Sequence, residues 1–152
     1  GFLFLRENSV MNKNCPLCTA DGGELVWSNE YLRVILANEP DYPGFCRVIW
    51  SKHLAEMTDL AIEDRSLMMR TVMKVEQAIL DVMQPDKVNL AALGNMVPHL
   101  HWHVIPRYRK DITFPGSVWS VPQRASDAIH LAEQLAKVSA LKKQLKDTLG
   151  VG

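Results

Sequence analysis

The sequence has no excess of charge of either sign, because 17 Lys and Arg residues balance 17 Asp and Glu residues. The basic residues are scattered, apart from a few lysines near the C-terminus, so no binding surface for long nucleic acid is expected. A long apolar run is also missing, since the apolar stretch at the N-terminus ends at Arg6, too early for a signal peptide or a membrane span. We therefore expect a cytoplasmic protein that binds neither long nucleic acid nor a membrane.

Cysteine is scarce as well. Three cysteines in 152 residues do not make the disulfide framework of a small secreted protein. The sequence has no low-complexity segment and no repeat, and its length suits one domain with a sizeable core. We expect that domain to span residues 15–152. Residues 1–14 are expected to be an N-terminal extension, partly a tag or flexible, because Gly1 stands where Met is expected.

The order of apolar and turn-forming segments predicts an α+β fold with a mostly antiparallel sheet. Runs rich in β-branched and aromatic residues predict strands at 24–28, 31–37, 45–51, 87–93 and 99–105. Residues 58–83 lack Gly and Pro and place apolar side chains at steps of three and four, which predicts one long helix with Thr58 or Asp59 as N-cap. A second helix is predicted at 124–148. Pro106 is expected to end the last strand.

Three of the five histidines of the chain, His99, His101 and His103, alternate with apolar or aromatic residues. Alternate side chains of a β-strand share one face, so the three imidazoles are predicted to form one surface while their neighbours face the core. Stacking three titratable rings on one face does not improve the packing of a core, so a purely structural role does not explain the alternation. His130 stands alone on the terminal helix and is more simply a structural residue. The alternation therefore indicates a functional site.

Two chemistries suit such a site. A His-x-His pair can supply two metal ligands, or one imidazole can act as a nucleophile while the others stabilise charge. A metal-dependent hydrolase needs further ligands, yet no Asp or Glu lies between Lys87 and Lys110. Nucleophilic catalysis needs only a neutral imidazole held in one tautomer, with hydrogen-bond donors around the electrophile. The sequence favours catalysis without an obligatory metal and leaves the metal-dependent hydrolase as the weaker alternative.

Cys15 and Cys18 form a Cys-x-x-Cys pair. On its own this pair is compatible with a redox dithiol, half of a zinc site or two reduced core thiols. The βαβ context of a thioredoxin-like redox motif is missing. Cys46 stands in an apolar run and is predicted to be a small core residue.

The segment His99–Ile105, "HLHWHVI", resembles the His-φ-His-φ-His-φ-φ signature of the histidine triad (HIT) superfamily, in which φ is apolar. "HVIPRY" is similar to the continuation in its bacterial and diadenosine-polyphosphate-hydrolase-like members. Upstream, "ANEPDYPGFCRVIWSKHLAEMTDL" resembles the family's Pro-Gly, strand, His and helix region. The resemblance covers about residues 15–120 and implies the HIT fold, a five-stranded mostly antiparallel sheet with one long inserted helix and a C-terminal helix, in a homodimer.

The resemblance also implies a function. His101 would attack the α-phosphorus of a purine nucleotide and form a nucleotidyl-histidine intermediate that water releases. The substrate would be an AMP-containing nucleotide, of the dinucleoside polyphosphate or nucleoside phosphoramidate type, and catalysis would require no cofactor. His99 and His103 would contact the phosphate and leaving group, Asn95 the phosphate oxygens and Asn38 the ribose. A nucleotide-binding regulatory dimer with little turnover is the alternative.

Some relatives bind a structural zinc at positions that match Cys15, Cys18, His53 and His99. In that case His99 would brace the strand under His101; otherwise His53 would simply border the substrate. Trp119 resembles a C-terminal Trp that relatives place near the active site, sometimes in the partner subunit, and the alternative is a loop anchor in its own protomer.

The sequence departs from the family at two places. The loop "LGNMVP" is short, and Phe45 stands where relatives often have His. These departures leave the identity of the second substrate moiety open.

Overall fold

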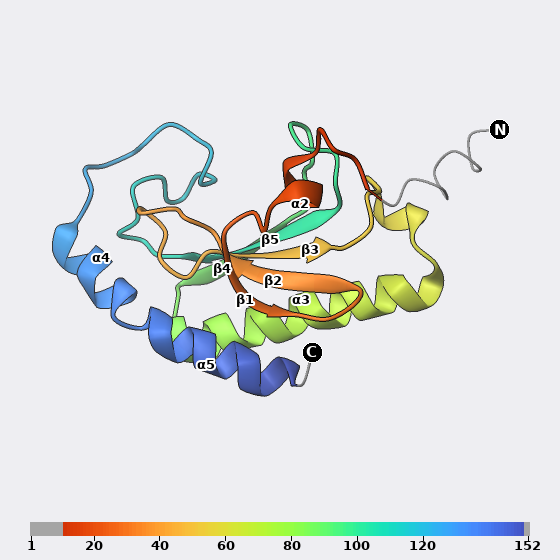
Figure 1. Ribbon diagram of the computed structural model, residues 1–152. Helices are drawn as coiled ribbons and strands as arrows, with labels where there is room; N and C mark the ends of the chain where they lie inside the picture. Colours follow the sequence, from red (N-terminus) through yellow and green to blue (C-terminus); the bar gives the residue numbers. More distant parts are fainter. Residues whose placement is uncertain (1–10, 151–152) are drawn as a thin grey trace.

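The computed structural model describes residues 11–150 (Figure 1), so most of the predicted N-terminal extension lies outside the described residues. The strands are β1 (Glu24–Ser28), β2 (Leu32–Leu36), β3 (Cys46–Trp50), β4 (Lys87–Ala91) and β5 (His101–Arg107). The helices are α2 (Pro16–Thr19), the 3₁₀ helix η1 (Met57–Asp59), α3 (Ile62–Met83), α4 (Ala128–Leu135) and α5 (Val138–Leu149). The strands form one sheet in the order β1-β2-β3-β5-β4, and all neighbours are antiparallel. The predicted α+β class and five-stranded antiparallel sheet are confirmed.

One face of the sheet is covered by α3 and α5 (Figure 1). The apolar stripe of α3 recurs at steps of three and four residues, and Met68, Val72 and Ile79 in it are fully buried. They pack against strand side chains such as Val48 and Val104. Burial of this apolar surface is the main force that holds the helices on the sheet.

The long helix starts later than its sequence predicts. Thr58 and Asp59 belong to η1, where the Asp59 carboxylate accepts the backbone N–H of Glu56 at 3.0 Å. The N-cap of α3 is instead Ala61, which makes no side-chain cap hydrogen bond. The prediction of Thr58 or Asp59 as N-cap is wrong because a local capping box already uses Asp59.

The predicted C-terminal helix at 124–148 is divided into α4 and α5. It begins only at Ala128, because the Asp127 side chain accepts the backbone N–H of His130 and caps the helix there. The backbone N–H of Lys137 then donates to Gln134 at 3.0 Å, a tighter turn than that of an α-helix. This turn redirects the chain so that α5 packs along α3.

The last strand lies two residues further along than predicted, and Pro106 does not end it. Beyond Val104, β5 pairs only with β4, where Pro106 stands opposite Val88. A residue without an N–H is tolerated there because the β3 side requires no further ladder hydrogen bond. His99 consequently precedes the strand rather than opening it.

The opposite face of the sheet is only partly covered, by α2 and the loops (Figure 1). Cys15 and Leu17 pack on Ile35 and Ile49 in a small second core. Arg33 of β2 ties this segment down, since its guanidinium donates to the carbonyls of residues 17, 20 and 21. Between residues 11 and 150, no helix combines the length and apolarity that crossing a membrane requires.

Candidate active site

A cavity of about 510 Å³ opens on this partly covered face. It contains four residues that the sequence singled out, namely Asn95, His101, His103 and Trp119. Further lining comes from α2, from the loop before β5 and from Arg47 of β3. The fold thus brings side chains from distant parts of the chain around one volume large enough for a small ligand.

His101 is held in a single tautomer. Its Nδ1 lies 2.6 Å from the backbone carbonyl of His99, and because a carbonyl only accepts, Nδ1 carries the hydrogen and Nε2 keeps its lone pair. Burial and the nearby charge of Arg47 lower the pKa of His101, although the hydrogen bond to His99 opposes them. The ring is therefore neutral near pH 7, which is the state that a nucleophile requires.

His103 is a neutral hydrogen-bond donor beside it. Burial, then the charges of His101 and Arg47, lower its pKa to about 4. Its Nδ1 accepts the Nε–H of Arg47 at 3.4 Å, so the hydrogen of the neutral ring resides on Nε2. The ring is enclosed edge-on by His101, Trp119 and Phe45, with centroids 4.9, 5.0 and 5.7 Å away.

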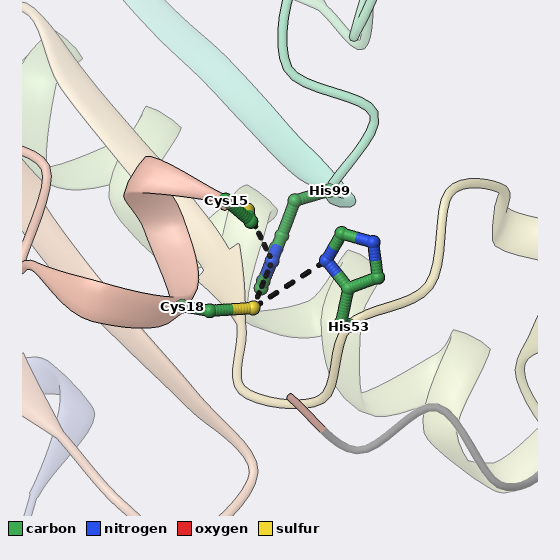
Figure 2. Close-up of side chains that lie close together, drawn as sticks. All are labelled: Cys15, Cys18, His53 and His99. Atoms are coloured by element: carbon green, nitrogen blue, oxygen red, sulfur yellow. Dashed lines mark hydrogen bonds between the residues drawn. The ribbon is translucent and has the colours of Figure 1, made fainter. Parts of the chain in front are cut away.

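His99 turns away from this cavity toward the two cysteines (Figure 2). It is fully buried, and its Nε2 donates to the carbonyl of Trp50 at 2.5 Å. Its Nδ1 therefore presents a lone pair at 3.5 Å from Cys15 Sγ and 3.4 Å from Cys18 Sγ. The two ends of the ring are used by the backbone and by the cysteine pair.

His53 completes this second cluster (Figure 2). Its Nδ1 lies 3.4 Å from Cys18 Sγ, and the ligand atoms of Cys15, Cys18, His53 and His99 lie within 4.8 Å of one another. Two thiols and two imidazoles are the donor set of a closed tetrahedral zinc site. The single turn of α2 brings both sulfurs to the same side, so the four side chains fit a zinc ion.

Asn95 and Asn38 lie in different places. Asn95 follows Gly94, whose φ of +74° turns the chain at the cavity. Asn38 is exposed and lines another cavity, of about 410 Å³, together with Gly44 and residues of α4 and α5 such as Leu135. The predicted ribose contact of Asn38 stays a prediction, and it would require a ligand that reaches beyond the cavity of the histidines.

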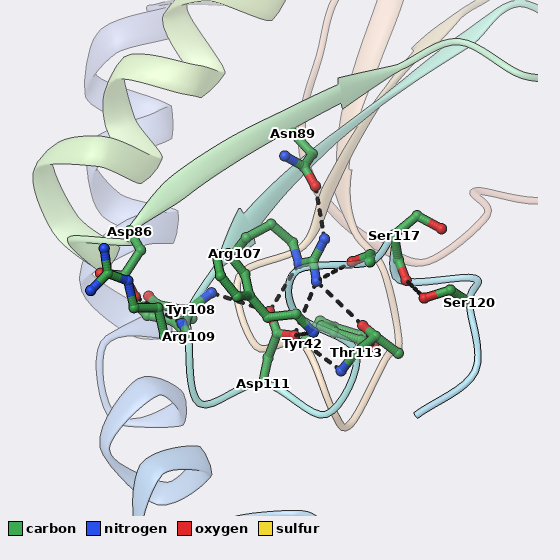
Figure 3. A network of polar contacts seen from close by, with 12 residues as sticks. Tyr42, Asp86, Asn89, Arg107, Tyr108, Arg109, Asp111, Thr113, Ser117 and Ser120 are labelled. Atoms are coloured by element: carbon green, nitrogen blue, oxygen red, sulfur yellow. Dashed lines mark hydrogen bonds and ion pairs between the residues drawn. The ribbon is translucent and has the colours of Figure 1, made fainter. Parts of the chain in front are cut away.

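A buried polar network around Arg107 and Asp111 holds the loop that carries Trp119, and Figure 3 shows this network. Arg107, 2% exposed, forms two hydrogen bonds with the Asp111 carboxylate, at 2.9 and 3.0 Å, and one with the carbonyl of Gly116 at 2.7 Å. Asn89 of β4 accepts another at 2.8 Å. These contacts fix the loop 111–120 to the end of β5, and Trp119 from this loop contacts His103 of the same protomer.

The sequence model of the HIT domain matches residues 22–110, more than half of the 152-residue chain. The protein belongs to the HIT family.

Relatives of this HIT chain come from several bacteria. It is 26% identical over 137 residues to "Protein hit" of Bacillus subtilis, covering 82% of this chain and 94% of that one. It is 27% identical over 125 residues to an "AP-4-A phosphorylase" of Mycobacterium tuberculosis, covering 76% of this chain but only 64% of that longer protein. A crystal structure of a histidine triad protein from Bradyrhizobium japonicum superposes with a TM-score of 0.71 at 25% identity, covering 90% of this chain and 99% of that one.

Sequence reasoning missed two arginines of this HIT protein. Arg107 lies two residues after the histidine motif, but its buried partners Asp111 and Gly116 are brought to it by a loop that no pattern predicts. Arg47 carried a usable signal, because it is the one charged residue in the apolar strand segment "FCRVIW". A lone charge within a buried strand is costly unless something pairs with it.

Proposed function

We propose that this HIT protein is a nucleotide hydrolase or transferase that acts at the α-phosphate of a purine nucleotide, such as a dinucleoside polyphosphate or a nucleoside phosphoramidate. The observation that carries the proposal is the hydrogen bond from Nδ1 of His101 to the carbonyl of His99, which leaves the basic Nε2 for attack. The mycobacterial relative, an AP-4-A phosphorylase by name, supports this class of substrate. A partly buried, neutral imidazole beside further donors is suited to phosphoryl chemistry.

The reaction would proceed in two displacements. Nε2 of His101 attacks the α-phosphorus, a P–N bond forms, and the bond to the leaving group breaks with its electron pair going to that group. The ring becomes positively charged, and the carbonyl of His99 stabilises this charge through the Nδ1–H. Water then attacks phosphorus, the P–N bond breaks, and AMP, a proton and the neutral ring result.

The other donors would act on the phosphate. The Nε2–H of His103 and the side chain or backbone N–H of Asn95 would hold its oxygens, and both residues line the cavity with His101. Donors placed before the reaction stabilise developing charge without reorganising. Trp119, against the ring of His103, would limit the access of water from that side.

We also propose that Cys15, Cys18, His53 and His99 hold a structural zinc. A bound zinc would cross-link α2 to the segment just before the strand that carries His101, and four protein ligands would leave it no open position for substrate. The chain itself holds His99 in the tautomer that offers Nδ1 to such an ion.

A homodimer is proposed from the family resemblance. Among the described strands, β1 and β4 each have a neighbour on one side only, and an edge strand offers unpaired backbone groups to a second copy. The mass of the protein in solution tests this assembly.

Turnover of an adenylate substrate panel by the wild type and His101→Asn tests the function. We expect the wild type to release AMP and the variant to lose activity by about a thousandfold or more, the scale of losing a catalytic nucleophile, with an unchanged fold by circular dichroism. Comparable activity in the two proteins would reject the assignment. Tight AMP binding without turnover in the wild type would instead indicate a nucleotide-binding regulatory dimer.

A further inference from the structure

We propose that Arg47 determines specificity by binding a negatively charged leaving group, so that the protein prefers nucleotides whose α-phosphate is joined to a further phosphate. This inference rests on the proposed function and names the class of substrate within it. Phosphoramidates, whose leaving group is an amine, would be poorer substrates.

The register of the sheet places Arg47 beside the histidines. Arg47 stands opposite His103, and Ile49, two residues further on, stands opposite His101. Alternate residues of adjacent strands share one face, with Cβ atoms of opposite residues about 4.5–5.5 Å apart. Arg47 therefore lines the same cavity as both histidines, yet lies to one side of the attacking ring.

Arg47 is the single ionised side chain among the described residues that line this cavity. Its guanidinium is half-buried, and burial is the main cause that lowers its pKa. Glu39 is the one acid whose charge opposes this shift, and Glu39 lines the other cavity. No carboxylate of residues 11–150 forms an ion pair with Arg47.

The donors of Arg47 are largely unused. Nε donates to His103 at 3.4 Å and one Nη to the carbonyl of Gly22 at 3.3 Å, both longer than strong hydrogen bonds of this type. For the other Nη, no acceptor is present in the described part of the chain. Arg33 of the neighbouring strand β2 differs, because its guanidinium donates three hydrogen bonds of 2.8–3.0 Å to backbone carbonyls.

An anion in the cavity would resolve this imbalance. A guanidinium taken partly out of water without a counter-charge is unfavourable, and phosphate oxygens match its planar donor fork. The α-phosphate already has His101, His103 and Asn95 around it. Arg47, displaced along the sheet by roughly 6–7 Å from the position opposite His101, suits the next phosphate of the chain.

Kinetics with two substrates test the inference. We expect Arg47→Gln to lower kcat/KM for diadenosine tetraphosphate by about tenfold or more, the scale of a lost charge-assisted hydrogen bond, with a clearly smaller loss for adenosine 5′-phosphoramidate. Arg47→Lys should restore part of the selectivity, because it retains the charge. Arg70→Gln, which removes the same charge from the exposed face of α3, serves as the matched control. Equal losses on both substrates would overturn the inference, since a structural role or a role at the α-phosphate affects both alike.

Calorimetry with inorganic pyrophosphate is independent of turnover. We expect pyrophosphate to bind the wild type and Arg70→Gln and to bind Arg47→Gln about tenfold or more weaker. Absent binding to the wild type, or equal binding to Arg47→Gln, would overturn the inference. Pyrophosphate binding through Arg47 without cleavage of either nucleotide would support the anion site and reject the proposed reaction.

Discussion

The sheet face under α3 and α5 buries apolar side chains such as Val48 and Val104, whereas the other face of the same strands presents Arg47, His101 and His103 to a cavity. Strand β3 serves both faces, because Val48 packs into the core while Arg47 beside it contacts His103. The alternation of side chains therefore separates the groups that stabilise the fold from those that would carry the chemistry. Substitutions on the two faces are expected to have different consequences.

The largest expected effect falls on the network that connects the site loop to the sheet. Asp111→Asn leaves the guanidinium of Arg107 buried without its anion, so we expect the free energy of unfolding in urea to fall by about 3–5 kcal/mol. Activity should fall as well, because the loop that carries Trp119 is released from β5. Asp81→Asn, on the exposed side of α3, is the control and should change neither. An unaltered urea midpoint for Asp111→Asn would contradict the role of the network.

The pH dependence of this effect has a definite sign. Burial raises the pKa of Asp111, but the hydrogen bonds and charge of Arg107 and the backbone N–H of Tyr108 outweigh it, and the pKa lies below its ordinary value of 3.8. The carboxylate thus contributes stability above that pH and loses it as the pH falls through the folded-state pKa. The advantage of the wild type over Asp111→Asn should shrink on acidification below this value.

A core substitution on the helix face should affect stability alone. Ile79→Ala removes a fully buried side chain of α3, and we expect the unfolding free energy to fall by about 2–5 kcal/mol. The activity of the folded fraction should be retained, since Ile79 packs in the core beneath the sheet. Leu80→Ala, whose side chain is 40% exposed, should cost much less. A change in KM of the folded Ile79→Ala protein would show that the two faces are not independent.

A smaller effect is expected from a substitution in the cysteine cluster, which should change the zinc content of the protein. Purified wild type should contain about one zinc per chain by elemental analysis, because one closed set of four ligands binds one ion. Cys18→Ser should lose the metal, while Cys46→Ala, which changes a core thiol outside the cluster, should retain it. Zinc retained in full by Cys18→Ser would place the ion elsewhere.

Local patterns predicted the parts of the molecule that depend on local physics. The alternation of His99, His101 and His103 predicted a site at this segment. Five of the six other predicted site residues lie beside these histidines, namely Cys15, Cys18, His53, Asn95 and Trp119. The start of α3 was predicted wrongly because Asp59, the expected N-cap, forms a capping box with Glu56 in η1 instead. The division of the last helix was missed because the turn at Lys137 has no Gly or Pro to mark it.

The arginines could not be assigned from sequence because their partners are set by tertiary structure. Whether Arg47 is paired depends on the register of β3 with β5. Arg107 depends on a loop that returns to the end of its own strand. For His99 the family resemblance left two roles open, a zinc ligand and a phosphate contact, and the structure directs its ring to the cysteines.

Covalent trapping of the nucleotide on His101 is a direct test of this residue as the nucleophile. The protein is mixed with an adenylate substrate, quenched in base after a short time and digested, and the peptides are analysed by mass spectrometry. We expect an AMP adduct on the peptide that contains His101, and no adduct in His101→Asn. An adduct on another residue, or one that persists in His101→Asn, would contradict it.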